Sequence, residues 1–198
     1  MMALIKNKKD SRIMVFIDVR NVINASREEC KHACKVDFVE MTNRLLDHRD
    51  LVAAYIFDGK GVQGSPSFEK FHDCLEFDGF RVITTDSYET DYREQKGVDV
   101  AMASEMLVQA FNDNFDVAIV VSGDGDFVPA IEHLQRMGKI VEVASFATST
   151  NRSIRKAADR YHSLSALPIL YLEDYNNHSN GEENLSMEST DDVTAEAD

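Results

Sequence analysis

The chain has 198 residues, of which 43% are hydrophobic, and a formal net charge of −14. This length suits one well-buried domain and is short for two, and no apolar run approaches the roughly 20 residues that cross a bilayer. Because the lysine-rich start at residues 1–10 lacks the apolar core of a signal peptide, we expect a cytoplasmic protein without a membrane partner.

The acidic charge is distributed unevenly along the chain. Residues 173–198 contain nine acids and no Lys or Arg, so only five of the fourteen net negative charges belong to the remainder. This acidic tail has too few apolar residues to offset the entropy lost on ordering. We therefore expect the tail to be disordered, and we expect residues 1–11 to form a basic N-terminal extension.

The three cysteines are Cys30, Cys34 and Cys74. Their number is odd, and their spacing matches no recognisable disulfide framework. Such usage is typical of a reducing compartment, in which thiols stay reduced. We expect all three to be free thiols.

Short apolar runs alternate with helix-length segments over residues 12–144. The expected strands are 12–18, 51–57, 80–84, 116–121 and 140–144, and the expected helices are 36–47, 67–77, 98–111 and 127–137. Strands that alternate with helices of this length pair in parallel through right-handed crossovers. The pattern therefore predicts an α/β fold, a three-layer α/β/α sandwich with a mainly parallel, Rossmann-like sheet.

Four acidic residues stand near the expected ends of strands or the start of a helix. Asp18 ends the first strand, Asp124 and Asp126 occupy the turn after the fourth, and Asp99 lies in the first turn of the helix between them. In open parallel sheets, ligands bind outside the carboxyl ends of the strands, near the point where the strand order reverses. We expect the four carboxylates to converge at this edge.

Clustered carboxylates raise one another's pKa and oppose full ionisation unless cations are present. Mg²⁺ and Mn²⁺ prefer oxygen ligands, whereas zinc usually brings His or Cys. Two such ions activate a water and stabilise the departing oxygen of a phosphodiester, so the pattern favours a Mg²⁺ or Mn²⁺ site. Each acid also has a structural interpretation, because Asp is a common turn former and helix cap.

Three motifs resemble those of the NYN domain family, LabA-like branch, within the PIN-like nuclease superfamily. They are Phe16-Ile17-Asp18-Val19-Arg20-Asn21, Lys96-Gly97-Val98-Asp99-Val100 and Val121-Ser122-Gly123-Asp124-Gly125-Asp126-Phe127-Val128-Pro129-Ala130. The resemblance spans about residues 12–164 and implies a PIN-like sheet and Mg²⁺-dependent cleavage of RNA. We assign residues 12–172 to this domain.

The resemblance also implies roles for individual residues. Asp18, Asp99, Asp124 and Asp126 match the family's acidic positions, and Asn21 and Ser122 match its polar positions beside the metals. The chain departs from the family at Val19-Arg20, where many relatives have small or polar residues. We expect Arg20 to contact phosphate or to restrict access to the site.

Two polar segments supply further candidates for RNA contact. In the connection 85–96, Tyr88 and Tyr92 are suited to stack on bases, and Arg93 and Lys96 to meet phosphates of single-stranded RNA. After the fifth strand, Arg152 and Arg155 lie at an expected helix start, a place that binds phosphate readily. The alternatives are an ordinary solvated loop and a solvated helical face.

These features favour a metal-dependent endoribonuclease that hydrolyses phosphodiester bonds of single-stranded or loop RNA. The alternative is a non-catalytic RNA-binding or regulatory assembly module on the same fold. A phosphotransfer or phosphatase domain with an aspartyl nucleophile also places acids at strand ends. It fits less well, because the residues beside Asp18 include no second acid. The choice between RNA and DNA, and between monomer and homo-oligomer, stays open.

Overall fold

The computed structural model of the protein describes residues 11–31, 34–59, 66–85 and 97–172. The strands are β1 (Ile13–Asp18), β2 (Cys34–Val36), β3 (Leu51–Gly59), β4 (Arg81–Thr85), β5 (Val117–Val121), β6 (Ile140–Ser145), β7 (Arg160–Ser163) and β8 (Leu170–Leu172). The helices are α1 (Val19–Cys30), α2 (Phe38–Leu46), α3 (Pro66–Phe77), α4 (Val98–Phe111), α5 (Val128–Arg136) and α6 (Arg152–Ala157), with short 3-10 helices η1 (Gly125–Phe127) and η2 (Leu164–Ala166). The predicted acidic tail and residues 1–10 of the predicted extension lie outside the described residues.

Six strands form one sheet in the order β4-β3-β1-β5-β6-β7. All five of its strand pairs are parallel. The central strands β1 and β5 are buried along their whole length, because helices cover both faces of the sheet. The predicted parallel α/β sandwich is confirmed.

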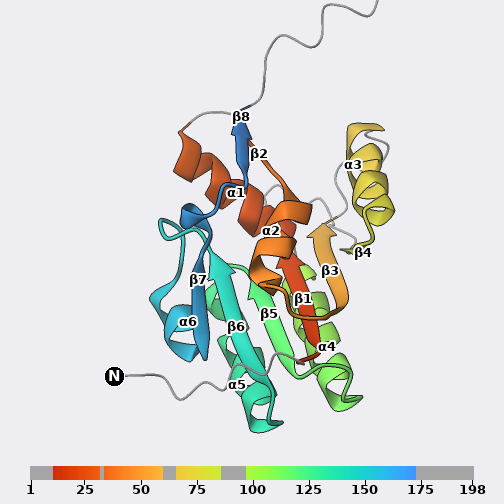
Figure 1. Ribbon diagram of the computed structural model, residues 1–198, viewed down its shortest axis with the longest axis vertical. Coiled ribbons are helices and arrows are strands. Elements are labelled where there is room, and N and C mark those ends of the chain that lie inside the picture. Colours follow the sequence, from red (N-terminus) through yellow and green to blue (C-terminus); the bar gives the residue numbers. More distant parts are fainter. Residues whose placement is uncertain (1–10, 32–33, 60–65, 86–96, 173–198) are drawn as a thin grey trace, which may run out of the picture.

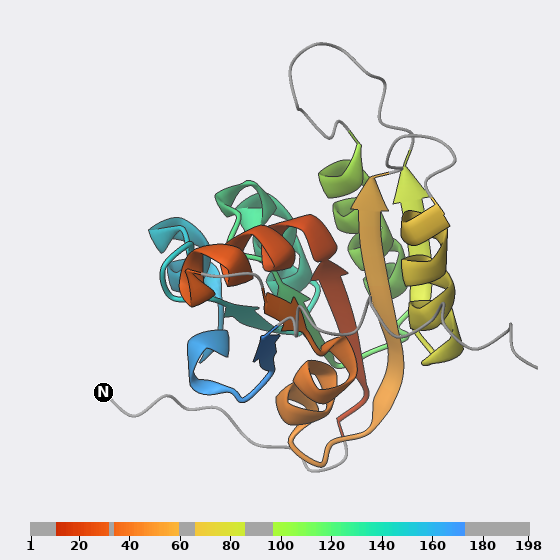
Figure 2. The ribbon, with the colours of Figure 1, turned by 90° about the horizontal axis from the view of Figure 1, so that it is seen from above.

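Helices cover the two faces of the sheet in separate layers (Figure 1). Alternate residues of β1 point to opposite layers. Ile17 packs in a core with Val22 of α1 and Leu45 of α2, whereas Phe16 packs in a second core with Met102 of α4 and Ile131 of α5. Figure 2 shows α3 lying alongside β3 and β4, where its residue Leu75 joins the first core.

The helix α1 was absent from the predicted elements. Its first turns contain β-branched residues and asparagine, which have modest helix propensity. Tertiary packing stabilises the helix, because Val19, Val22, Ala25 and Ser26 are buried against the sheet. The three-residue strands β2 and β8, which pair only with each other, are too short to give a clear sequence pattern.

The prediction of three free thiols was wrong for two of the cysteines. A disulfide joins Cys30, at the end of α1, to Cys34, at the start of β2. After α1 the chain passes through a left-handed conformation at Lys31, and the two Cα atoms lie 6.5 Å apart, within the range that a disulfide spans. Cys74 is free and exposed.

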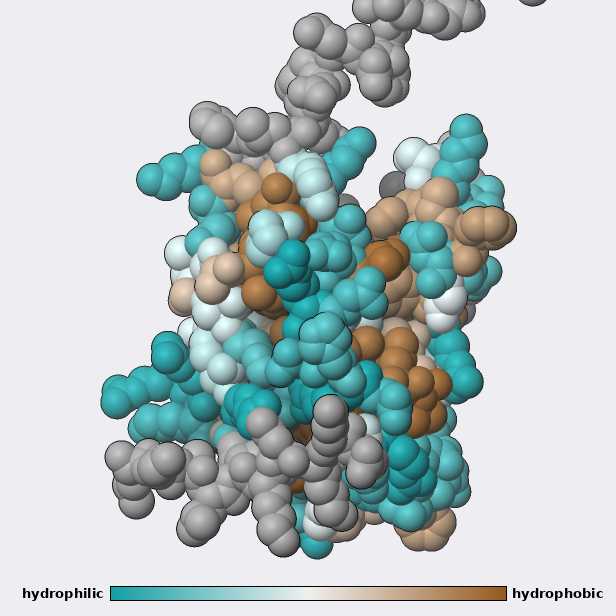
Figure 3. Space-filling view, in the orientation of Figure 1, coloured by the Kyte–Doolittle hydropathy of each residue, from teal (hydrophilic) through white to brown (hydrophobic). Residues whose placement is uncertain are grey.

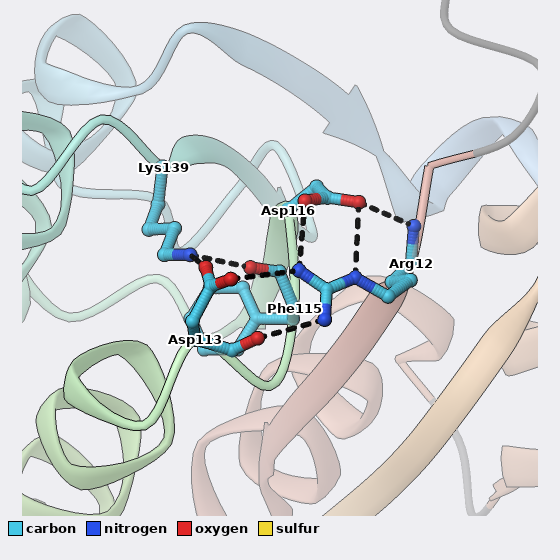
Figure 4. A network of polar contacts seen from close by, with 5 residues as sticks. All are labelled: Arg12, Asp113, Phe115, Asp116 and Lys139. Atoms are coloured by element: carbon cyan, nitrogen blue, oxygen red, sulfur yellow. Dashed lines mark hydrogen bonds and ion pairs between the residues drawn. The ribbon is translucent and has the colours of Figure 1, made fainter.

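A network of charged residues holds together the amino-terminal edge of the sheet (Figure 4). The Arg12 guanidinium donates to the Asp116 carboxylate at 3.1 and 3.3 Å and to the Asp113 carbonyl at 2.7 Å. Lys139 pairs with the Asp113 carboxylate and donates to the Phe115 carbonyl at 2.8 Å. These bonds join β1 to the loops before β5 and β6, at the edge opposite the acids discussed below.

The start of β3 exposes hydrophobic side chains. Leu51 and Val52 are both partly exposed, and Figure 3 shows hydrophobic surface over this end of the strand. The pairing with β4 begins only at Tyr55, so the first residues of β3 have no β4 partner. None of the helices in the described ranges is both long and apolar enough to span a membrane.

Candidate functional site at the carboxyl edge of the sheet

The strand order reverses at β1. From β1 the chain proceeds through β3 to β4 on one side, and after α4 it continues through β5, β6 and β7 on the other. Where the order reverses, the connections leave the two adjacent carboxyl ends in opposite directions and create a crevice for ligands. The residues that follow β1 and β5 are therefore the first candidates for a functional site.

Asp18 ends β1 and caps the N-terminus of α1. One carboxylate oxygen accepts a hydrogen bond from the Asn21 backbone N–H at 3.0 Å, and the other accepts from the Ser122 hydroxyl at 3.3 Å. Only 6% of Asp18 is exposed. The ends of β1 and β5 thus meet at a nearly buried carboxylate.

The turn after β5 continues this hydrogen-bonded arrangement. The Asn21 side-chain carbonyl accepts from the Gly123 N–H at 2.9 Å, and the Ser122 hydroxyl accepts from the Asp124 N–H at 3.2 Å. Asp124 in turn caps η1 by accepting from the Asp126 N–H at 3.0 Å. Asn21 and Ser122 therefore fix the positions of the carboxylates around them.

Two glycines let this turn pack closely against α6. A Cβ atom on Gly123 would lie 2.8 Å from the Ser149 carbonyl oxygen, and one on Gly125 would lie 2.8 Å from the Ser153 hydroxyl. The Asn151 N–H also donates to the Gly123 carbonyl at 2.9 Å. The start of α6, with its exposed residue Arg152, is thereby placed beside the acidic turn.

Asp99, the second residue of α4, contributes to the same edge. Burial raises its pKa, and the charges of Asp124 and Asp126 raise it further. The pKa of Asp18 is raised to about 6, first by burial and then by the charges of Asp99 and Asp124, against the opposing hydrogen bonds from Asn21 and Ser122. The structure thus brings Asp18 within electrostatic range of Asp99 and Asp124, and Asp99 within range of Asp124 and Asp126.

Carboxylates can influence one another's pKa over distances that are too long for them to coordinate the same metal ion. Among the described residues, no three His, Cys, Asp or Glu side chains form a group that could hold a metal ion as they stand. The donor set itself suits a hard divalent cation, because carboxylate and hydroxyl oxygens are the ligands that Mg²⁺ and Mn²⁺ prefer. The raised pKa of Asp18 also fits, since a nearby cation would offset the cost of its buried charge.

The Arg20 side chain binds a different acid, Asp58, which was not among the predicted site residues. Its Nε donates to the Asp58 carboxylate at 2.7 Å, and the His72 Nε2 lies 3.0 Å from the other Asp58 oxygen. Asp58 follows Phe57, the register partner of Asp18. An acid at the end of a buried strand was a signal available in the sequence, whereas the position of His72 depends on the packing of α3.

The remaining predicted RNA contacts divide into two groups. Arg152 and Arg155 are both exposed on α6, and the Arg155 guanidinium carbon lies 4.6 Å from the centre of the Tyr161 ring. The predicted contacts in the connection before α4 lie outside the described residues; they are Tyr88, Tyr92, Arg93 and Lys96.

A family model, the NYN domain, matches residues 12–167 of the chain. The chain belongs to the NYN domain family. The low amplitude and bright protein LabA from Synechococcus elongatus is 26% identical over 165 residues, which cover 79% of this chain and 85% of that protein. The predicted membership of the NYN family and the similarity to LabA are therefore confirmed.

A crystal structure of a protein of unknown function from Vibrio parahaemolyticus has the same fold. Its TM-score is 0.70 at 24% identity, over 84% of this chain and all of that one. Membership of the NYN family suggests a nuclease-like, RNA-related function, and nucleases of this family usually use divalent metals.

Proposed function

We propose that this NYN protein is a Mg²⁺- or Mn²⁺-dependent endoribonuclease that hydrolyses single-stranded or loop RNA. The main support is the set of four aspartates at the carboxyl edge of the sheet, where burial raises the pKa of Asp18 and Asp99 and the charges of neighbouring aspartates raise it further. The mutual repulsion of these charges is unfavourable in the folded protein. A bound divalent cation would remove that disadvantage.

Asp18, Asp99, Asp124 and Asp126 are the residues that would hold the cation. When bound, a divalent ion at such a site supplies a water of lowered pKa and stabilises the leaving oxygen of the phosphodiester. Ser122 orients the Asp18 carboxylate and holds the Asp124 backbone, and Asn21 fixes Gly123. These two residues therefore position the acids.

The test is incubation of the purified protein with labelled single-stranded RNA and DNA, with Mg²⁺, with Mn²⁺ and with EDTA. We expect metal-dependent cleavage of RNA, and a loss of at least about two orders of magnitude in Asp124→Asn and Asp126→Asn proteins. Glu132→Gln on the exposed face of α5 is a matched control and should cleave normally. Cleavage undiminished by EDTA, or full cleavage by both variants, would contradict the proposal.

A non-catalytic RNA-binding module is the second candidate. It is favoured by the internal hydrogen bonds of the site, since both oxygens of Asp18 and one of Asp124 already accept bonds from the protein. Such bonds stabilise the acids without a cation. RNA binding that needs no metal, without cleavage of varied RNAs, would favour this module over the enzyme.

A further inference from the structure

A second polar cluster lies at the carboxyl edge, between β1 and α3. We propose that Arg20 binds a backbone phosphate of the RNA on the β3 side of the four aspartates, and that Asp58 and His72 hold Arg20 in the orientation this requires. The inference rests on the proposed function, and it adds one phosphate contact and two positioning residues to it.

The location of Arg20 follows from the register of the sheet. Asp18 pairs with Phe57, so Asp58 lies one residue farther along the same edge. Arg20 is the second residue of α1, which begins directly after Asp18. The pair formed by Arg20 and Asp58 therefore lies one strand away from the carboxylate at the centre of the proposed site.

The cluster fixes the direction of the guanidinium. The Asp58 side chain is only 2% exposed, and it binds Arg20 through Nε rather than through the terminal nitrogens. Phe68 of α3 lies beside the guanidinium, whose central carbon is 5.7 Å from the ring centre. His72 binds the other oxygen of Asp58 and so limits the rotation of that carboxylate.

This arrangement leaves the terminal nitrogens of Arg20 for a ligand. Within the part of the chain that the structure describes, neither of them has a hydrogen-bond acceptor, and the Arg20 side chain is 39% exposed. A guanidinium offers two parallel N–H donors that match the oxygens of a phosphate. With Nε bound to Asp58, Arg20 presents these donors in a fixed orientation.

The other exposed arginines of the edge lie on the opposite side of the aspartates. Figure 1 shows α6 beside β7 and α3 beside β4, at the two sides of the sheet. Arg152 is on α6 next to the acidic turn, whereas Arg20 contacts α3 through Phe68. An RNA strand laid along this edge would meet a cation on each side of the acids, which by themselves repel phosphate.

The structural alternative is that the ion pair only ties α1 to β3 and α3. Asp58→Asn separates the two interpretations by the sign of its effect. Removal of one negative charge near the RNA path should strengthen binding if only the net charge matters. If Asp58 positions Arg20, the same change should weaken binding, because the guanidinium loses its fixed orientation.

The experiment measures the affinity of the full-length protein for a fluorescently labelled single-stranded RNA, in EDTA to prevent cleavage, over a series of salt concentrations. We expect Arg20→Ala to weaken binding about tenfold. The slope of the logarithm of the binding constant against the logarithm of the salt concentration should become shallower by about 0.7, the value for one lost phosphate contact on a single strand. Arg20→Lys should keep most of the slope but lose affinity, because one ammonium cannot serve Asp58 and a phosphate together.

We expect Asp58→Asn and His72→Gln to weaken binding severalfold, with native circular dichroism. The matched control is Arg136→Ala, which removes an exposed arginine at the end of α5 and should leave affinity and slope unchanged.

Tighter binding by Asp58→Asn, or wild-type affinity in both Arg20 variants, would overturn the inference alone. Failure of the wild-type protein to bind RNA in EDTA would overturn the inference, whereas the proposed function is tested separately by cleavage in Mg²⁺ or Mn²⁺. Equal dependence on Arg20 with single-stranded DNA would support a contact to phosphate.

Discussion

At the scale of single residues, Asp18 carries the strongest electrostatic conflict in the candidate site. Its carboxylate is nearly buried, and burial together with Asp99 and Asp124 raises its pKa from 3.8 to about 6. Between about pH 4 and about pH 6, Asp18 keeps its proton in the folded state but has released it in the unfolded state. The free energy of unfolding therefore falls as pH rises through this range. Above that range, the ionised carboxylate costs roughly 3 kcal/mol.

The first prediction follows from this cost. At neutral pH without divalent metal, Asp18→Asn should raise the free energy of unfolding by about 1–2 kcal/mol, less than the full cost because the amide fits the Ser122 contact less well. The variant should also lose the dependence of stability on pH between about 4 and about 6. Urea unfolding at several pH values measures both effects. A less stable variant with an unchanged pH profile would show that Asp18 is not the titrating group.

The sequence predicted the acids of the site but not all of its polar residues. Asp18 ends a buried strand, and Asp124 and Asp126 follow another; the apolar runs mark where each strand ends. Asp58 also lies near the end of such a strand, but its role depends on Arg20 and His72. That contact requires both α1 and α3 to reach the end of β3, which no local pattern specifies.

At the scale of secondary-structure elements, the turn after β5 is held against α6 by close contact at Gly123. Gly123→Ala should destabilise the protein by about 1–3 kcal/mol, because its Cβ would lie 2.8 Å from the backbone carbonyl oxygen of Ser149. The displaced turn should also lower RNA cleavage. Gly138→Ala serves as a comparison, since a Cβ there meets no atom within 4 Å and only its positive φ of 81° is strained.

Thermal unfolding of both glycine variants, with cleavage assays, measures these effects. Gly138 lies between α5 and the start of β6, at the edge of the sheet opposite the acids, so Gly138→Ala should lose stability without losing cleavage per folded molecule. Normal cleavage by a folded Gly123→Ala protein would show that the position of this turn does not control the site.

A buried ion cluster joins three further elements. The Glu142 side chain on β6 is 3% exposed and binds Arg49 before β3 at 2.8 and 3.0 Å and His162 on β7 at 2.8 Å. Burial alone would raise the pKa of Glu142, but the bonds from His162 and Arg49 hold it at about 2. Its stabilising effect is therefore present above the unfolded pKa of about 4.5 and is lost as pH falls toward about 2.

Glu142→Gln should accordingly lower the free energy of unfolding by about 3 kcal/mol at neutral pH, because Arg49 would be left with an uncompensated, mostly buried charge. The RNA site should keep its affinity per folded molecule, since Glu142 lies away from the carboxyl end of β6. Chemical denaturation and RNA titration measure the two quantities. A change of less than about 1 kcal/mol would show that the cluster contributes little to stability.

The apolar strands and the helices α2, α3, α4 and α5 were predictable, whereas α1 and the shortest strands were not. The five predicted strands became β1, β3, β4, β5 and β6, with boundaries that differ by one or two residues. Each of the five contains apolar residues, and all of them except β4 are mostly buried in the sheet. The helix α1 and the strand β7 depend on tertiary packing, and the disulfide depends on the conformation of the chain after α1.

At the scale of the whole molecule, the two edges of the sheet differ in charge balance. At the amino-terminal edge, Arg12 and Lys139 pair with Asp113 and Asp116, and these bonds lower the pKa of both acids. At the carboxyl edge, Asp18 and Asp99 have raised pKa values. The acids of the amino-terminal edge are thus neutralised within the protein, whereas Asp18 and Asp99 at the carboxyl edge are the acids that a bound cation would stabilise under the proposed function.

The most direct test of this conclusion is one time course of single-stranded RNA cleavage by the wild-type protein and the Asp99→Asn variant. Mn²⁺ is added first, then excess EDTA, and then excess Mn²⁺ again. We predict that the wild-type protein cleaves, stops and resumes, while the folded variant is slower by at least about two orders of magnitude throughout. Cleavage that continues in EDTA, or that proceeds equally in Asp99→Asn, would contradict a metal-dependent site built from these aspartates.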